Sequence, residues 1–196
     1  MRARIIGKKF FYNLCKSGVI SKDNVEVCTF GLQRLLIFLL NVFTYIIIGL
    51  VFDMPLESVI FILAYPPLRI FAGGYHAKSP ISCYFLGVFL FGLMLLLQRV
   101  AVVYNLPFIA TGIIAAIGIA RIAPVESPNK PLEDIEVKIY GNSTKLIIQI
   151  EIVLALALYL MGQIVASMAI FIPMIMLWGV LLIGRYNNLT KKCRKV

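Results

Sequence analysis

The chain has 196 residues, 61% of them hydrophobic and 14% charged, and its 19 Lys and Arg against 9 Asp and Glu give a formal net charge of +10. Soluble domains are about 45–50% apolar and about 25% charged. The composition therefore excludes a disordered chain, which would be polar, and a soluble domain, which would need more polar residues to cover its surface. Its long runs of Leu, Ile, Val and Phe also argue against a nucleic-acid binder, so no nucleic-acid partner is expected. The composition predicts an integral membrane protein.

The apolar residues predict an all-α, polytopic bundle of about six membrane-spanning helices, forming a single domain over residues 1–196. A helix needs about 20 mostly apolar residues to cross the hydrocarbon core of a bilayer. The second candidate is short and contains Pro66-Pro67, and proline removes a backbone donor and clashes with the preceding turn. We expect that segment to be a short span or a re-entrant element facing protein or a cavity. The six candidates are Leu35–Phe52, Leu56–Leu68, Ile81–Leu97, Leu106–Ala123, Leu146–Val165 and Ala166–Gly184.

The distribution of Lys and Arg predicts the orientation of these spans. With a cytoplasmic N-terminus, 18 of the 19 cations fall in the segments 1–34, 69–80, 121–145 and the C-terminal tail, and only Arg99 falls outside them. An excess of Lys and Arg marks cytoplasmic segments. Both termini are therefore predicted to be cytoplasmic, and the turns on the other side, around 53–55, 98–105 and 163–167, are short.

The N-terminal 34 residues show no cleavable signal peptide, because their basic start is not followed by a compact apolar core and a small-residue cleavage site. Ile6, Phe10 and Leu14 share one helical stripe, which predicts an amphipathic segment lying on an anionic membrane surface. A plain basic topogenic tail fits the same residues. The four cysteines map to the cytoplasmic side, where disulfides are not expected, and their spacing matches no zinc site.

One cysteine, Cys83, stands where a helix is predicted to begin. Ser79-Pro80 has the form of a helix start, with Ser as the N-cap and Pro as the first helical residue. Cys83 then falls near the positive end of the helix dipole, which favours a thiolate, the nucleophilic form of cysteine. The free backbone N–H groups of that turn are suited to stabilising an oxyanion.

The loop before this helix carries the only histidine of the chain, His76, next to Lys78. Gly73-Gly74 gives the loop access to positive φ and lets backbone approach closely. If the loop folds back over the helix start, His76 can activate the Cys83 thiol and later protonate a leaving amine. The same residues also fit structural roles, because a lone Cys in a membrane helix is often an apolar filler. A metal site is not expected, since no second histidine exists and no carboxylate lies in this loop.

Two segments together resemble the accessory gene regulator B (AgrB) family of bacterial membrane cysteine endopeptidases. The first reads Gly73-Gly74-Tyr75-His76-Ala77-Lys78-Ser79-Pro80, with Cys83 seven positions after His76. The second reads Ala123-Pro124-Val125-Glu126-Ser127-Pro128-Asn129-Lys130-Pro131-Leu132 and is similar to the family's Ala-Pro…Lys-Pro segment. Length, hydropathy and the basic cytoplasmic face match as well, so the resemblance covers essentially the whole chain.

The resemblance implies that His76 and Cys83 are the catalytic residues of a bacterial cell-membrane enzyme acting in quorum sensing. Family members cleave an AgrD-type propeptide, remove its acidic C-terminal tail and hold the new acyl end as a thioester on the enzyme. A cysteine of the peptide then closes a thiolactone ring, or a serine a lactone. No cofactor is implied, because the cysteine carries the chemistry. A homodimer is implied as well.

Several further residues gain a predicted role from this resemblance. Arg69, Lys78, Lys130 and Lys138 flank the site on the predicted cytoplasmic side and can hold an acidic tail by charge complementarity, although each also fits the ordinary positive-inside pattern. We group Gly73, Gly74 and Ser79 with them as supporting residues. The third catalytic residue, which orients His76, stays open among Gln33, Glu126 and Asn129.

Two other classes of protein remain as alternatives. One is a small peptide transporter or export component that uses the broken second span, as discontinuous helices are used in transporters. The other is a membrane scaffold or sensor subunit without enzymatic activity. Intramembrane polar residues are few, which argues against the transporter, and the scaffold predicts an ordinary Cys83 thiol.

Overall fold

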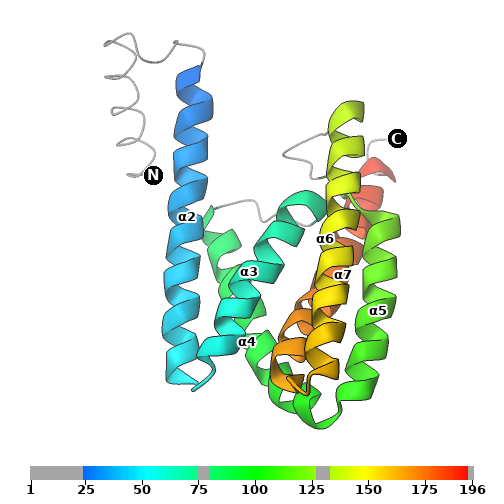
Figure 1. Ribbon diagram of the computed structural model, residues 1–196. Coiled ribbons are helices and arrows are strands. Elements are labelled where there is room, and N and C mark those ends of the chain that lie inside the picture. The colour runs from blue at the N-terminus through cyan, green and yellow to red at the C-terminus, as the bar shows by residue number, and fades with distance from the viewer. Residues whose placement is uncertain (1–23, 75–79, 127–132, 194–196) are drawn as a thin grey trace.

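The computed structural model describes residues 24–74, 80–126 and 133–193, and these residues form six helices (Figure 1). Helices α3 to α7 are each long and apolar enough to cross a membrane, and the apolar part of α2 is Leu35–Val51. The prediction of an all-α polytopic membrane bundle is therefore confirmed. The helices are α2 (Asn24–Val51), α3 (Pro55–Ala72), α4 (Pro80–Val103), α5 (Asn105–Ile122), α6 (Asp134–Leu160) and α7 (Ile164–Cys193).

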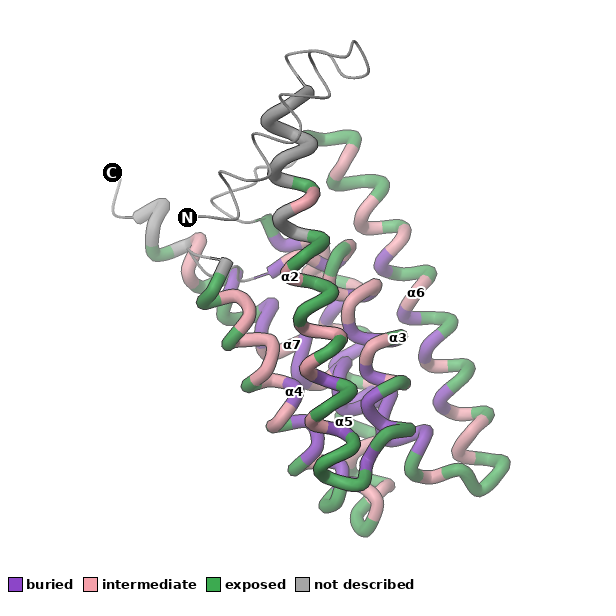
Figure 2. The backbone as a smooth tube through the Cα atoms, turned by 90° about the vertical axis from the view of Figure 1, so that its left-hand side faces the viewer, coloured by how far each residue is buried: buried purple, intermediate pink, exposed green. Residues whose placement is uncertain are grey.

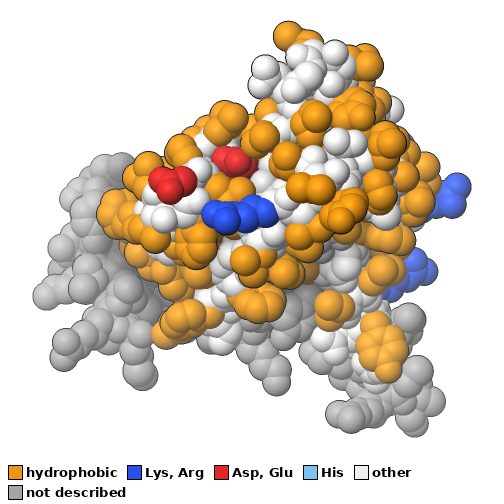
Figure 3. Space-filling model, turned by 90° about the horizontal axis from the view of Figure 1, so that it is seen from below, with side chains coloured by type: hydrophobic (Ala, Val, Ile, Leu, Met, Phe, Trp, Pro, Cys, Tyr) orange, Lys and Arg blue, Asp and Glu red, His pale blue; other side chains and the backbone are white. Residues whose placement is uncertain are grey.

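Tight turns close one end of the bundle. Residues 52–54 join α2 to α3, Tyr104 separates α4 from α5, and residues 161–163 join α6 to α7, all at the bottom of Figure 1. We call this the turn end, and the opposite end, where α4 begins, the Cys83 end. Seen from the turn end, the surface is mostly hydrophobic with few charged side chains (Figure 3). Short apolar connections of this kind fit the small non-cytoplasmic turns that the sequence predicts.

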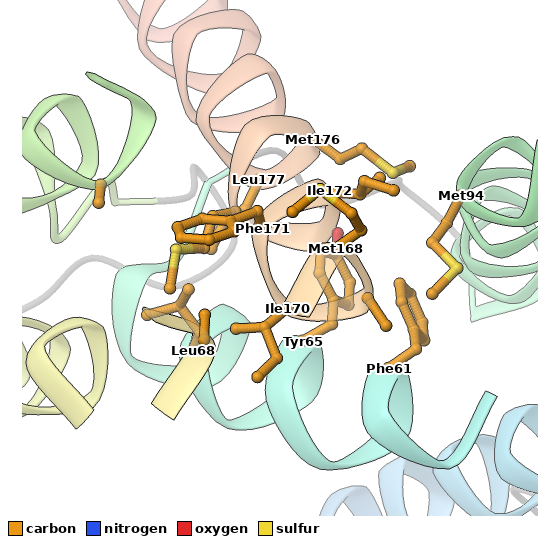
Figure 4. Close-up of a cluster of buried hydrophobic side chains, with 14 of the residues drawn as sticks. Phe61, Tyr65, Leu68, Met94, Met168, Ile170, Phe171, Ile172, Met176 and Leu177 are labelled. Carbon is orange, nitrogen blue, oxygen red and sulfur yellow. The ribbon is translucent and has the colours of Figure 1, made fainter. Parts of the chain in front are cut away.

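Helix α7 forms the centre of the bundle. It packs against α3, α4, α5 and α6, and most of its residues up to Leu181 are buried, as Figure 2 shows. The close-up in Figure 4 shows Leu68 of α3 beside Phe171 of α7, and Phe61 of α3 close to Met94 of α4. Helix α2 packs against α3 and α4 and leaves a wide apolar face exposed, which is what lipid would cover in a membrane.

Small residues let α5 approach α7 closely. A Cβ placed on Gly112 would lie 2.5 Å from the Phe171 ring, and one on Gly118 would meet the Trp178 indole. Ala116, beside them on α5, is fully buried. Small residues at helix interfaces are typical of membrane bundles because they allow close backbone contact. In this chain, the small residues of α5 therefore serve packing within one molecule.

The sequence left the second span open as a short span or a re-entrant element, and the structure has the first of these. Helix α3 is one helix of 18 residues that contains both Pro66 and Pro67, and its length of about 27 Å nearly matches the hydrocarbon thickness. Both prolines are half-buried, and Tyr65 and Leu68 on either side are buried. Packing on both sides of the prolines therefore keeps α3 continuous where the local sequence favours an interruption.

Two boundaries also need correction. The boundary between the predicted spans Leu146–Val165 and Ala166–Gly184 lies earlier in the structure. Helix α6 ends at Leu160, and Gly162, with φ +78°, lies in the turn to α7. Glycine reaches this conformation without steric cost. The predicted turn around residues 98–105 shrinks to Tyr104, so Arg99 lies on α4. The predicted amphipathic segment within residues 1–23 lies outside the described residues.

Candidate active site at the start of α4

The structure places Cys83 at the beginning of a long helix, as the sequence predicts. Helix α4 starts at Pro80, so Cys83 is its fourth residue, and its thiol is free and partly buried. The N–H groups of the first helical turn have no partner within the helix and carry the positive end of its dipole. Both effects make the start of α4 suited to stabilising an oxyanion that forms beside it.

Three side chains from two neighbouring helices lie within electrostatic range of Cys83. Tyr45 of α2, together with Tyr65 and Arg69 of α3, each lies close enough to Cys83 to interact with it electrostatically. Cys83 therefore faces the junction of α2, α3 and α4. The three residues place one cation and two hydroxyl groups within electrostatic range of the Cys83 thiol.

A hydrogen bond fixes the start of α4 against α2. The hydroxyl groups of Tyr84 and Thr44 lie 2.9 Å apart, and Thr44 Oγ1 also donates to the Leu40 carbonyl of its own helix at 2.8 Å. Because Tyr84 follows Cys83 directly, this contact sets the rotation of α4 about its axis. The rotation in turn decides which neighbours Cys83 faces.

Arg69 connects the end of α3 to the glycine pair. Its guanidinium donates a hydrogen bond to the Gly73 carbonyl and lies against Gly74. Both glycines have positive φ, +73° and +105°, which other residues rarely adopt. A Cβ on Gly74 would also collide with the Arg69 guanidinium. The Gly-Gly pair thus leaves the space that the Arg69 guanidinium occupies.

The two segments that carry the family resemblance meet in the structure. Gly74 N donates to the Val125 carbonyl at 3.0 Å, and Val125 N donates to the Ala72 carbonyl at 2.9 Å. This pair of bonds forms an isolated parallel bridge between the end of α3 and the segment after α5. The α7 side chain of Asn188 adds a bond to the Glu126 carbonyl at 2.7 Å. Residues more than 50 positions apart in the chain therefore build one surface at the Cys83 end.

Four predicted site residues, His76, Lys78, Ser79 and Lys130, lie outside the described residues. The same holds for Asn129, one of the candidates to orient the histidine. The loop predicted over residues 69–80 is shorter in the structure, because α3 continues to Ala72; Gly74 at its start lies beside Arg69, and it ends at Pro80, three residues before Cys83. Its two fixed ends thus flank the junction that Cys83 faces.

The other predicted residues are dispersed. Gln33 lies on α2, where the structure describes its backbone but not its side chain. Glu126 is exposed, and Lys138 is exposed on the first turns of α6. In the described ranges, no group of three or more His, Cys, Asp or Glu residues has the geometry to hold a metal ion.

Sequence reasoning missed Tyr45 and Tyr65. A signal was available for Tyr65, because it precedes Arg69 by four positions and so shares its face of α3. A weaker signal pointed to Tyr45, which follows Asn41 by four positions in an otherwise apolar stretch. Neither spacing shows that these faces meet Cys83, since that depends on how the helices pack.

The family profile described as accessory gene regulator B matches residues 7–183 of the chain. The chain belongs to the accessory gene regulator B family. This membership connects it to the accessory gene regulator quorum-sensing system.

Two curated relatives are similar over part of the chain. An AgrB-like protein, as it is named, of Clostridium perfringens strain SM101 is 30% identical over 129 residues, covering 60% of this chain and 59% of the relative. A second, named as AgrB-like protein 2, of C. perfringens strain 13 is 28% identical over 126 residues with the same coverage. The match thus spans about three fifths of the length of these relatives. No solved structure matches the chain.

Proposed function

We propose that this AgrB-family protein is a membrane cysteine endopeptidase that cleaves an AgrD-type propeptide through a thioester on Cys83. The observation that carries the proposal is the position of Cys83, which lies in the first turns of α4 and faces Arg69 of α3. A helix N-terminus and a nearby cation both stabilise a thiolate. His76, seven residues earlier, is the proposed base.

The first half of the reaction forms the acyl-enzyme. His76 takes the proton of the Cys83 thiol, and the sulfur attacks the carbonyl carbon of the scissile peptide bond. A C–S bond forms while the carbonyl electron pair moves to oxygen, where free N–H groups at the start of α4 stabilise the charge. The C–N bond then breaks, and the leaving amine takes the proton from His76. The acidic tail departs, and a thioester remains.

The second half closes the ring. A thiol of the bound peptide loses its proton to His76 and attacks the thioester, so that a new C–S bond replaces the bond to Cys83 and the Cys83 thiol is restored. Water would hydrolyse the thioester instead, and a site at the membrane interface limits its access. A peptide that offers serine would give a lactone by the same exchange.

In this scheme Arg69 stabilises the Cys83 thiolate, whereas the sequence predicts that it holds the acidic tail of the propeptide. Its guanidinium is partly buried and already donates to the Gly73 carbonyl. Its position lets it fix the loop and stabilise the thiolate. Lys78, Lys130 and Lys138 remain as the proposed cations for the acidic tail.

The test is to co-express the full chain with its candidate propeptide and to detect the cleaved and cyclised peptide by mass spectrometry. C83A and H76A are expected to abolish both products. C28A, which changes a cysteine on α2, should still form them. Normal cleavage by C83A would refute the cysteine mechanism. The transporter alternative relied on a broken second span, and the continuous α3 removes that support.

A further inference from the structure

The face of α7 that packs into the bundle continues toward the Cys83 end and finishes in an amide side chain. Leu177, Leu181 and Gly184 are buried, and their spacing places them on one face of the helix. Asn188 is the next position on the same face and is half-buried. At the Cys83 end, the buried face of α7 therefore changes from apolar side chains to a hydrogen-bonding group.

Asn188 holds the chain segment that follows α5. Its Nδ2 donates to the backbone carbonyl of Glu126 at 2.7 Å, although the two residues are 62 positions apart in the chain. Helix α5 ends at Ile122, so the Glu126 carbonyl lies outside that helix and needs a partner from elsewhere. The side chain of Asn188 is that partner, and it ties the segment to the end of α7.

The same face of α7 also contacts the other side of the parallel bridge. The bridge pairs Gly73 with Val125, and Asn188 binds the carbonyl of the residue directly after Val125. On the glycine side, a Cβ built on Gly74 would lie 3.0 Å from Leu181 Cδ2. Leu181 and Asn188 thus support the two sides of the bridge from one face of α7.

The bridge in turn holds the arginine of the candidate site. The Arg69 guanidinium donates to the Gly73 carbonyl and lies against Gly74. Arg69 also interacts electrostatically with Cys83. Because the guanidinium is bonded to a residue of the bridge, a shift of the bridge moves the positive charge relative to the sulfur. A continuous series of contacts therefore leads from Asn188 to the surroundings of Cys83.

We infer that Asn188 is a positioning residue, which holds the bridge in the place where Arg69 faces Cys83. The inference rests on the proposed function, because it assigns a further residue to that reaction. Asn188 lies outside residues 7–183, the part of the chain that the family profile matches. Because Asn188 acts on the sulfur through Arg69 and does not bind the propeptide, its loss should change kcat more than KM.

The first test measures propeptide cleavage by the purified full chain in lipid nanodiscs with a synthetic propeptide. N188D keeps the shape of the side chain but removes the N–H donor, and it is expected to lower kcat about tenfold, the order of one hydrogen bond, with KM nearly unchanged. N188Q keeps a donor and should recover part of this loss. The matched control is N187D, which places the same charge at the neighbouring asparagine of α7, also half-buried, and should cleave normally.

The second test does not depend on cleavage. In a chain that keeps Cys83 and has its other three cysteines replaced by alanine, the rate of Cys83 alkylation responds to the cation beside the thiol. R69Q removes that cation and should slow alkylation. N188D should slow it as well, whereas N187D should not. The double variant R69Q/N188D should react no more slowly than R69Q, because Asn188 acts through Arg69.

Two results would overturn the inference. One is that N188D matches N187D in both kcat and alkylation rate. The other is that the effects of R69Q and N188D multiply in the double variant, as the effects of independent sites do. Equal unfolding temperatures of N188D and N187D in detergent would separate the expected changes from loss of structure. Normal cleavage by C83A would instead refute the proposed function.

Discussion

Arg69 shows how one residue can serve the fold and the site together. Its guanidinium caps the carbonyl of Gly73, lies against Gly74 and interacts with Cys83. Its planar fork can make several directed contacts at once, which an ammonium on a flexible stem cannot. A lysine at this position would keep the positive charge but not this set of contacts.

R69K therefore tests geometry against charge. We expect cleavage to fall at least tenfold although the charge is retained, because lysine cannot hold the Gly73 carbonyl and face Cys83 together. The control is R121K in the last turn of α5, where the arginine is exposed, and it should cleave normally. Normal cleavage by R69K would mean that only the charge matters.

Gly73 is the residue at which the two family segments touch. A Cβ there would collide with the Val125 carbonyl oxygen, in addition to the strain of a side chain at φ +73°. Gly162 has a similar φ of +78°, but a Cβ added there would meet no other atom within 4 Å. Left-handed backbone costs a non-glycine residue about 1–2 kcal/mol.

We expect G162A to lose about that amount of stability and to retain cleavage. G73A should lose more stability and should also lose cleavage, because the bridge that carries Gly74 and Arg69 must shift. Thermal unfolding in detergent together with the cleavage assay measures both effects. Equal stability losses in the two variants would show that the collision with Val125 does not destabilise G73A.

Helix α3, which carries Tyr65 and Arg69, continues through two prolines. Proline in a helix interior removes a hydrogen bond, clashes with the carbonyl four residues earlier and costs about 3 kcal/mol relative to alanine. Such positions usually bend the helix. Because Pro66 and Pro67 lie between Tyr65 and Arg69, any bend they introduce sets the direction in which α3 delivers both side chains toward Cys83.

Replacing these prolines should separate stability from activity. P66A and P67A are expected to raise the unfolding temperature, because they restore helical hydrogen bonds, and to lower cleavage, because a straighter α3 moves Arg69. P173A, in the middle of α7 and outside the Cys83 site, is the matched control and should raise stability without affecting cleavage. A rise in cleavage for P66A would contradict this role of the bend.

The same helix shows where sequence reasoning succeeds and where it fails. Local rules placed the start of α4 correctly, because a first-turn proline acts on its own backbone. They left α3 open between a short span and a re-entrant element, because the packing around Tyr65 and Leu68 that keeps the helix continuous depends on other helices. They did not find Tyr45 and Tyr65, since the approach of both to Cys83 depends on contacts between helices far apart in sequence. Motifs thus singled out Cys83 as the candidate nucleophile, whereas its neighbours could be found only from the fold.

The whole molecule is asymmetric in charge along the axis of the bundle. Arg69 and Arg121 lie in the last turns of α3 and α5 at the Cys83 end, where Lys138 lies near the start of α6. Arg99 lies near the turn end, on the last part of α4. Because cations favour the cytoplasmic side, this arrangement predicts that Cys83 works from the cytoplasm, where an unprocessed propeptide would be found.

Labelling of single cysteines in intact cells tests this orientation. In a chain whose four native cysteines are replaced, Q163C at the turn end should react with a membrane-impermeant maleimide. T190C near the end of α7 should react only after the cells are permeabilised, and both residues are exposed in the structure. The charge asymmetry gives the physical reason, because moving the cations at the Cys83 end across the bilayer is strongly unfavourable. Labelling of T190C but not Q163C in intact cells would invert the topology. It would place the Cys83 site outside the cell and require the propeptide to cross the membrane before it is cut.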